Sequence, residues 1–214
     1  LKRYDKTRLV TVAMHPRGRS LETDSLPAPL VHETDIAAYN YRYMYFPGDS
    51  KRFPHMMFYQ SEANTSNMGP NWFEMDLDKV LGLAYWGQID YLGESGSWPA
   101  KGWAQGAFDI SLQPKPIAYF LKSMFSDEPI VHIGIVESEE DRMWNGVQTG
   151  VARMNDHWNH KTDESLSIIT YTNGDEVELV LNGKSLGKKK NVEGKDCNRI
   201  RWNEVKYAPG YLEA

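Results

Sequence analysis

The pattern of hydrophobic residues changes near Asp127, and this change constrains the fold of the 214-residue chain more than any other feature. Before Asp127, short apolar runs alternate with longer polar or helical stretches, which is typical of strand and helix units that build a parallel sheet. After Asp127, strands and tight turns follow one another without a helical pattern. We therefore expect an α/β unit over residues 1–126 and an all-β unit over residues 127–214.

Four short strands are predicted in the first unit, each bounded by Pro, Gly or charged residues. They are Leu9–Met14, Asp35–Tyr39, His55–Gln60 and Leu83–Ile89. The apolar spacing of Asn71–Leu81 predicts a helix between the third and fourth strands. A second helix is predicted over Ile117–Phe125, because Pro114 and Pro116 stand at its entrance, where proline lacks only a donor that has no partner anyway.

The clearest strand of the second unit is Glu176–Leu181, in which alternate residues are apolar. Asn182-Gly183 follows it directly and predicts a two-residue type I′ hairpin. Further strands are predicted at Ile130–Val136, Ser167–Tyr171 and Arg199–Val205. Such a series of short strands is consistent with a small immunoglobulin-like β-sandwich.

Charge and composition argue against several classes of protein. The formal net charge is -5 without a basic stripe, so a nucleic acid is not an expected partner. No apolar run is long enough to span a membrane, so no membrane partner is expected either. The single Cys197 excludes an intrachain disulfide and a thiolate metal cluster. Because the chain starts at Leu1 without Met, we expect it to be an internal segment, which hides any targeting signal.

Aromatic residues make up 12% of the chain, and many stand beside polar residues or glycine. Flat rings that stack on pyranose faces, with a few placed polar groups, are typical of sugar sites. The alternative is that most of these rings fill the cores of the sheets.

Glu62 comes directly after the predicted strand His55–Gln60 and is followed by small and polar residues. If the parallel strands belong to a barrel, this position lies on the catalytic rim. A carboxylate there can attack an anomeric carbon when a second carboxyl group lies roughly 5 to 5.5 Å away and protonates the leaving oxygen. From spacing alone, the alternatives stay open: Glu62 could instead be a helix N-terminal charge or a salt-bridged rim residue.

Two other strand ends carry candidate substrate-binding residues. Trp86 could form a platform under the sugar, with Asp90 orienting nearby groups and Glu94 bonding at the rim. Asn40 and Tyr41 follow the second strand, so Tyr41 would lie beside the predicted nucleophile. Structural roles remain open for all of these residues.

No cofactor or metal is expected. His157 and His160 have a metal-like spacing, but they fall in a predicted loop with only aspartates nearby. No phosphate-binding loop or nucleophile elbow occurs. Ser61 has no matching His and Asp set, so serine hydrolysis has no support.

Several segments in order resemble the closing half of the catalytic barrel of glycoside hydrolase family 2 β-galactosidases. They are DIAAYNY, FYQSEANTSNM, LAYWGQIDYLGES, WPAKGWAQGAFDI and PKPIAYFLKSMF, and YTNGDEVELVLNGKSLGKKK with YAPGYLEA resembles the following sandwich. The resemblance implies α/β plus all-β architecture, with strands five to eight of a (β/α)8 TIM barrel over 1–126 and an immunoglobulin-like β-sandwich over 127–214. It also implies that Glu62 is the nucleophile, Tyr41 its neighbour and Trp86 the sugar-facing ring.

The same resemblance implies that the general acid/base is missing, because the family carries it as a Glu after Asn on the fourth strand, upstream of this chain. The only such pair here, Asn203-Glu204, falls in the predicted sandwich. We therefore expect a retaining exo-β-glycosidase as the parent, with β-linked sugars, galactosides first, as substrates, and no turnover by this chain alone. Gln60-Ser61 and Ser111-Leu112-Gln113 depart from the usual residues and leave the sugar open.

Further partners implied are the upstream part of the same enzyme and other copies of the chain, in a periplasmic or extracellular location. Two alternatives stay open. The protein could bind carbohydrate without hydrolysis, or the sandwich could serve only in assembly.

Overall fold

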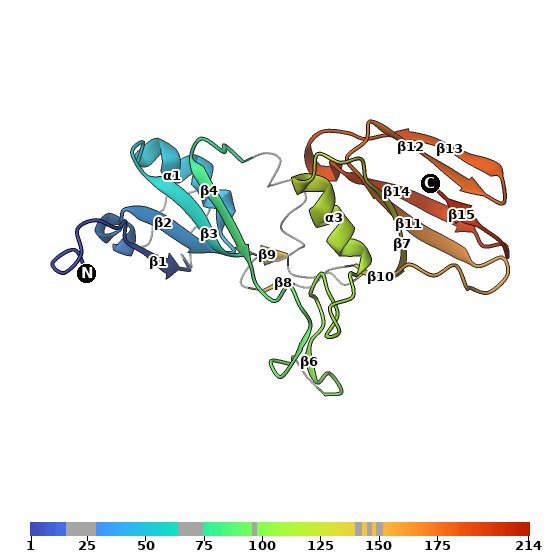
Figure 1. Cartoon of the computed structure of the whole chain (residues 1–214), viewed down its shortest axis with the longest axis horizontal. Coiled ribbons are helices and arrows are strands. Elements are labelled where there is room, and N and C mark those ends of the chain that lie inside the picture. The colour runs from blue at the N-terminus through green and yellow to red at the C-terminus, as the bar shows by residue number, and fades with distance from the viewer. Residues whose placement is uncertain (16–28, 64–74, 96–97, 140–142, 145–146, 149–151) are drawn as a thin grey trace. The chain divides into compact units, whose positions relative to one another are not determined.

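The computed structural model describes residues 1–15, 29–63, 75–95, 98–139, 143–144, 147–148 and 152–214. The chain forms two compact units (Figure 1). Unit 1 comprises residues 1–86 and 143–149, and unit 2 comprises residues 87–142 and 150–214. Within the described residues, no helix has both the length and the apolar character needed to cross a membrane.

Unit 1 is built on a parallel sheet of four strands that neighbour one another in chain order. The strands are β1 (Thr11–Met14), β2 (Ile36–Asn40), β3 (Met57–Ala63) and β4 (Val80–Tyr85). All four strands expected in this part of the sequence are therefore present, and their parallel pairing is confirmed. Since parallel strands point the same way, their carboxyl ends meet at one edge of the sheet.

Short helices cover one face of this sheet. They are η1 (Pro29–Glu33), η2 (Tyr43–Tyr45) and α1 (Phe46–Arg52). Aromatic rings from both layers meet in the core, with Phe46 and Phe58 at 5.2 Å between centroids and Tyr39 at 5.6 Å from Phe46. The buried cluster consists of Met14, Val31, Ala37, Tyr39, Phe46, Phe58 and Val80. This packing fixes which face of β2 and β3 is turned away from the helices.

Two sequence predictions in this unit need correction. The sequence places the fourth strand at Leu83–Ile89, but β4 begins at Val80, which pairs with Phe58 of β3, and ends at Tyr85. The chain leaves the sheet there because Gly87 adopts φ +60°. The predicted helix Asn71–Leu81 is wrong at its end, since Val80 and Leu81 belong to β4, and residues 71–74 lie outside the described residues. A short apolar run fits strand and helix alike, and pairing with β3 decides between them.

A separate two-stranded hairpin, β8 (Met143–Trp144) with β9 (Val147–Gln148), also belongs to unit 1.

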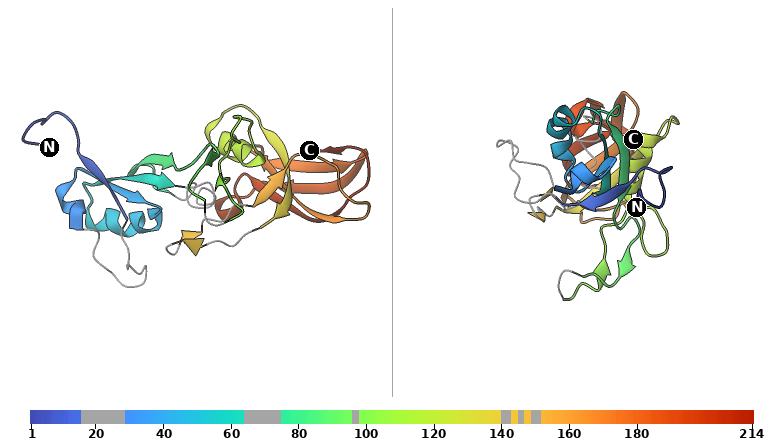
Figure 2. Two further views of the ribbon diagram at one scale, coloured as in Figure 1. Left: turned by 90° about the horizontal axis from the view of Figure 1, so that it is seen from below. Right: turned by 90° about the vertical axis from the view of Figure 1, so that its left-hand side faces the viewer.

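The β-sandwich of unit 2 is made of two antiparallel sheets, whose layers are visible in Figure 2. The first has the order β10 (Arg153–Asn155), β7 (Val131–Ser138), β11 (Ser165–Thr172), β14 (Arg199–Lys206), and the second has the order β13 (Lys184–Lys190), β12 (Glu176–Leu181), β15 (Leu212–Glu213). A short 3-10 helix, η4 (Gly194–Asp196), precedes β14. The predicted strands of the all-β unit are thus confirmed.

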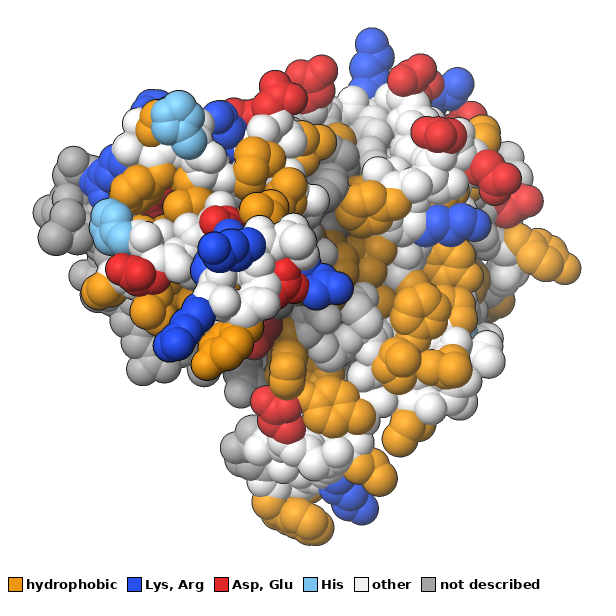
Figure 3. Space-filling view, turned by 60° about the vertical axis from the view of Figure 1, so that its left-hand side comes forward, with side chains coloured by type: hydrophobic (Ala, Val, Ile, Leu, Met, Phe, Trp, Pro, Cys, Tyr) orange, Lys and Arg blue, Asp and Glu red, His pale blue; other side chains and the backbone are white. Residues whose placement is uncertain are grey.

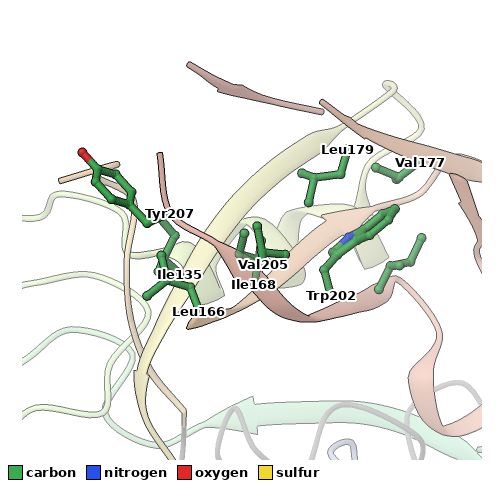
Figure 4. Close-up of a cluster of buried hydrophobic side chains, with 9 residues drawn as sticks. Ile135, Leu166, Ile168, Val177, Leu179, Trp202, Val205 and Tyr207 are labelled. Atoms are coloured by element: carbon green, nitrogen blue, oxygen red, sulfur yellow. The ribbon is translucent and has the colours of Figure 1, made fainter. Parts of the chain in front are cut away.

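The two sheets enclose one apolar core (Figure 4). Val177 and Leu179 of β12 face Ile168 of β11 and Trp202 of β14. The Trp202 Nε1–H donates to Thr170 Oγ1 at 3.1 Å, so the buried indole keeps a hydrogen bond. This face-to-face packing makes the unit a β-sandwich.

Helix α3 (Pro116–Phe125) covers the outer face of the larger sheet, and its predicted bounds are confirmed within one residue. Phe120 is fully buried and lies 5.5 Å from the ring of Tyr171 in β11. The compact units therefore divide after Trp86, earlier than the boundary expected near Asp127, because residues 87–126 pack with the sandwich. The assignment of 1–126 and 127–214 to different domains stays a prediction.

The turn between β12 and β13 is the two-residue hairpin that the sequence predicts. Leu181 pairs with Lys184 across it, and Asn182 and Gly183 have φ values of 52° and 76°. Positive φ at both central residues is the property of a type I′ turn. The Asn182 side chain also accepts a hydrogen bond from Tyr211 N at 2.8 Å.

Candidate active site at the carboxyl edge of the parallel sheet

Glu62 and Asn40 lie opposite each other where β2 and β3 end. The pairing register places Asn40 beside Glu62, and the Tyr41 N–H donates to the Glu62 carbonyl oxygen at 2.7 Å. Ser61 Oγ donates to Asn40 Oδ1 at 2.6 Å. The sheet thus brings together three of the predicted site residues, Asn40, Tyr41 and Glu62, through main-chain pairing.

The Glu62 side chain is half-buried, and it lies inside β3, not after the strand's end as the sequence suggested. Among the described residues, no hydrogen bond or ion pair engages its carboxylate. Among the residues that close β1 to β4, Glu62 is the one carboxylate. A half-buried carboxylate without an internal partner is available to a ligand.

Tyr41 has an unusual backbone for a bulky residue, with φ at 56°. Its side chain is 7% exposed. Holding a non-glycine residue in this region costs on the order of 1 kcal/mol or more, and such residues cluster at functional sites. The left-handed turn redirects the chain directly beside Glu62.

Trp86 is tied to the residue that follows the predicted nucleophile. Its N–H donates to the Ala63 carbonyl oxygen at 2.7 Å, which continues the pairing of β4 with β3 by one residue. The Trp86 side chain is 40% exposed, a large value for this residue type at the end of a strand. An exposed indole is suited to stacking on a sugar ring.

Asp90 and Glu94 belong to unit 2, and the structure gives both an internal partner. Asp90 accepts from Gly106 N at 2.9 Å and pairs with Lys115 Nζ at 2.6 Å. Glu94 accepts a hydrogen bond from the Tyr91 hydroxyl. Their roles in binding substrate stay predictions, and the visible function of Asp90 is to hold the chain near Gly106.

Comparison with known proteins supports the family resemblance. The chain is 29% identical over 141 residues to a β-galactosidase of Bacteroides ovatus and 32% identical over 142 residues to a putative β-glucuronidase of Formosa agariphila. A crystal structure described as a glycosyl hydrolase family 2 member from Bacteroides cellulosilyticus matches 99% of this chain with 28% identity and a TM-score of 0.74.

These matches confirm the resemblance to glycoside hydrolase family 2. A family profile described as a domain of unknown function (DUF4982) matches residues 163–214, which lie in the sandwich of unit 2. The matches to the Bacteroides ovatus and Formosa agariphila proteins cover 64% and 60% of this chain but only 14% and 11% of those relatives. The family 2 crystal structure is covered to 27%.

Two buried polar groups of this chain were not predicted from its sequence. Gln60 is 1% exposed, and Tyr85 is half-buried with a buried hydroxyl oxygen. Among the described residues, neither the Gln60 Nε2 nor the Tyr85 hydroxyl has a hydrogen-bond partner. Burial raises the pKa of Tyr85 far above its ordinary value, so the phenol stays protonated. The sequence did contain one signal for a buried polar group, because Gln60 is a polar residue inside an otherwise apolar run.

The histidine pair of the sandwich forms an aromatic group. The rings of His157 and His160 lie 5.3 Å apart, and His160 also packs on Trp158 and Tyr207. In the part of the chain that the structure describes, no three His, Cys, Asp or Glu residues gather in a way that could hold a metal ion.

Proposed function

We propose that the intact protein containing this chain hydrolyses terminal β-linked sugars through a covalent glycosyl intermediate on Glu62. The observation that carries the proposal is the position of Glu62. Its half-buried carboxylate has no partner among the described residues and lies at the carboxyl edge of a parallel sheet, next to Asn40 and Tyr41. In enzymes with parallel α/β architecture, this edge carries the chemistry.

We further propose that β1 to β4 are the last four strands of an eight-stranded barrel. Their parallel, sequential order and the helices between them fit the repeating unit of such a barrel. The outer edges of β1 and β4 would then pair with strands supplied by the rest of the protein, which removes two exposed sheet edges.

In the proposed reaction, a Glu62 carboxylate oxygen forms a bond to the anomeric carbon while the bond to the leaving oxygen breaks. A carboxylic acid from the upstream part of the protein gives its proton to that oxygen. The resulting carboxylate then takes a proton from water, which attacks the anomeric carbon and releases Glu62. Retention of the β configuration follows from the two displacements.

The surrounding residues have distinct roles in this proposal. Trp86 stacks under the sugar, and Asn40, held by Ser61, offers an amide to a sugar hydroxyl. The Tyr41 hydroxyl would bond to the Glu62 carboxylate in the complex with substrate, since the structure shows no such bond among the described residues. Asp90 and Glu94 remain candidates for the outer part of the binding site.

The chain alone should be inactive, because it lacks the acid/base. Loss of a positioned acid costs on the order of 10² to 10⁴ in rate. Galactosides are the first substrates to test, and glucuronides the second, because the two matched relatives are described as a β-galactosidase and a putative β-glucuronidase.

The deciding experiment uses the intact protein with p-nitrophenyl β-galactoside, β-glucuronide and β-mannoside. We expect turnover of one of them and at least a roughly 10³-fold loss of kcat in Glu62→Gln. Glu176→Gln, at an exposed residue of β12, is the matched control and should keep full activity. A 2-deoxy-2-fluoro glycoside should add its sugar mass to the peptide that contains Glu62. Equal turnover by Glu62→Gln and the parent contradicts the assignment.

A second candidate function, carbohydrate binding without hydrolysis, is favoured by the 40% exposure of Trp86, which can stack on a sugar whether or not a bond is cleaved. It predicts that the intact protein binds galactose or glucuronate in calorimetry but turns over none of the aryl glycosides. The face of the molecule in Figure 3 shows exposed apolar side chains interspersed with acidic and basic ones.

A further inference from the structure

We propose that Trp103 is a positioning residue for Trp86, and that it acts through the turn at Gly87. The role given to Trp86, that of sugar platform, rests on the proposed function. Trp103 lies in β6 (Gly102–Trp103), which pairs with β5 (Tyr91–Leu92) in a small two-stranded lobe of unit 2. Figure 1 shows this lobe projecting beside the label of β6.

Two hydrogen bonds bracket Trp86 in the chain. On its amino side, its own N–H is held by the Ala63 carbonyl at 2.7 Å. On its carboxyl side, the carbonyl oxygen of the next residue, Gly87, accepts from Trp103 Nε1 at 3.1 Å. The backbone is therefore held immediately before Trp86 and again one residue after it. With the backbone held on both sides, the direction of the indole depends only on which rotamer the Trp86 side chain adopts.

The Trp103 ring also packs directly on the turn. Gly87 has φ +60°, and a Cβ added there would lie 2.8 Å from Trp103 Cδ1, far inside van der Waals contact. Glycine is thus required for two reasons, the left-handed backbone and the close approach of the indole. The half-buried Trp103 side chain packs against Gly87, and only glycine at this position leaves room for the ring.

The lobe that carries Trp103 has a rigid base. Asp90 accepts from Gly106 N at 2.9 Å and from Lys115 Nζ at 2.7 Å, while Lys115 Nζ also donates to the Ala104 carbonyl at 3.0 Å. These charge-assisted bonds fix the segment immediately after Trp103. Trp103 can therefore transmit a defined position to Gly87.

Exposed residues of the same lobe offer matched controls. Trp98 is 84% exposed, so Trp98→Phe tests the loss of an indole without loss of the Gly87 contact. Gly93 has φ +95° but nothing within 4 Å of an added Cβ. Gly93→Ala therefore tests backbone strain alone, whereas Gly87→Ala adds the clash with Trp103.

The experiment compares Trp103→Phe, Gly87→Ala, Trp98→Phe and Gly93→Ala in the intact protein. The measurements are steady-state kinetics and 19F NMR after labelling with 5-fluorotryptophan. The resonance that disappears in Trp86→Phe belongs to Trp86. We expect Trp103→Phe, which loses the N–H but keeps a ring, to raise KM about 2- to 10-fold with kcat changed less than about 2-fold. Gly87→Ala should raise KM further, and the Trp86 resonance should shift or broaden in both. Trp98→Phe and Gly93→Ala should leave KM and the resonance unchanged.

The outcomes separate the positioning role from the proposed function. If the intact protein turns over no glycoside, the proposed function fails, and the Trp86 resonance alone decides the positioning role. An unchanged resonance in folded Trp103→Phe and Gly87→Ala overturns the inference, whatever the activity. If circular dichroism shows that either Trp103→Phe or Gly87→Ala is unfolded, the other variant decides the question. Loss of fold in both assigns Trp103 to structure only and also overturns the inference.

Discussion

The N–H of Tyr41 donates a hydrogen bond of 2.7 Å to the carbonyl oxygen of Glu62. This bond joins the end of β2 to β3 at the one residue that the proposed reaction uses as nucleophile. Because Tyr41 has a left-handed backbone at this point, its side chain leaves the sheet in a direction that the bond determines. Main-chain pairing places both residues at this edge of the sheet for the proposed covalent step.

Tyr41→Phe should preserve this backbone bond and remove only the phenol. If the hydroxyl stabilises the Glu62 carboxylate, its removal should lower kcat of the intact protein about 10- to 100-fold, the usual effect of one hydrogen bond to a charged group. Steady-state kinetics with the best aryl glycoside measures the effect. Tyr211→Phe, at a tyrosine that is 77% exposed in the sandwich, is the control. Unchanged kcat in Tyr41→Phe contradicts a role for the phenol.

Ser61→Ala should weaken substrate binding more than it slows the chemistry. Ser61 Oγ donates to Asn40 Oδ1 at 2.6 Å, so its removal frees the Asn40 amide to rotate. We expect KM to rise about 2- to 10-fold, the effect of one neutral hydrogen bond, with kcat nearly constant. Ser61→Thr keeps the hydroxyl and should restore KM. If Ser61→Ala and Ser61→Thr both lower kcat to a similar extent, the size of the side chain near Glu62 matters and the hydrogen bond to Asn40 does not.

Leu179→Ala should destabilise the sandwich far more than Leu186→Ala, although the two residues lie in paired strands of one hairpin. Leu179 is fully buried in the core, whereas Leu186 is 39% exposed. The expected loss of opening free energy is about 2 to 5 kcal/mol for Leu179→Ala and about 0.5 kcal/mol for Leu186→Ala. Native-state hydrogen exchange of β11 and β14 amides in the intact protein measures both. Similar losses for the two variants contradict the arrangement of the core.

The stability of unit 2 should fall in mild acid through His132. Its ring stacks on Tyr119 at 3.6 Å between centroids, and burial lowers the pKa of His132 below the ordinary 6.5, with nearby Asp156 opposing the shift. The unfolded state therefore binds the proton at higher pH than the folded state, and stability is lost as pH falls from 6.5 toward the lower folded pKa.

His132→Gln removes this titration and should flatten the dependence. The measurement is the thermal midpoint at pH 7.5 and pH 5.0 in the parent and the variant, compared as differences. His157→Gln, at an exposed histidine of the same unit, is the control and should keep the parent's slope. An equal acid-induced drop in parent and His132→Gln would contradict the effect.

Much of the sandwich could be predicted from local patterns. The alternation in Glu176–Leu181 and the Asn182-Gly183 pair specify a strand and a type I′ turn from neighbouring residues alone, and the structure has both. The strands of the parallel sheet were also visible as short apolar runs. The fourth strand was shifted because nothing within that run shows where pairing with β3 begins.

The candidate site was predicted in part, since the strand pattern alone is enough to propose residues near strand ends as rim residues. The roles of Asp90 and Trp103 could not be predicted this way. Asp90 bonds to Gly106 and Lys115, and Trp103 bonds to Gly87, across 16 to 25 positions of sequence. No local pattern encodes such pairs.

The sequence by itself determined the series of strands and turns, the choice of Glu62 as the candidate nucleophile and the family resemblance. Periodicity, turn residues and ordered motifs are local properties, so the sequence alone carries them. The tertiary structure decided which residues share the edge of the sheet with Glu62 and that helix α3 packs on the larger sheet of the sandwich. The physical reason is that pairing register and burial are set by contacts between distant segments, whose free energies no single segment contains.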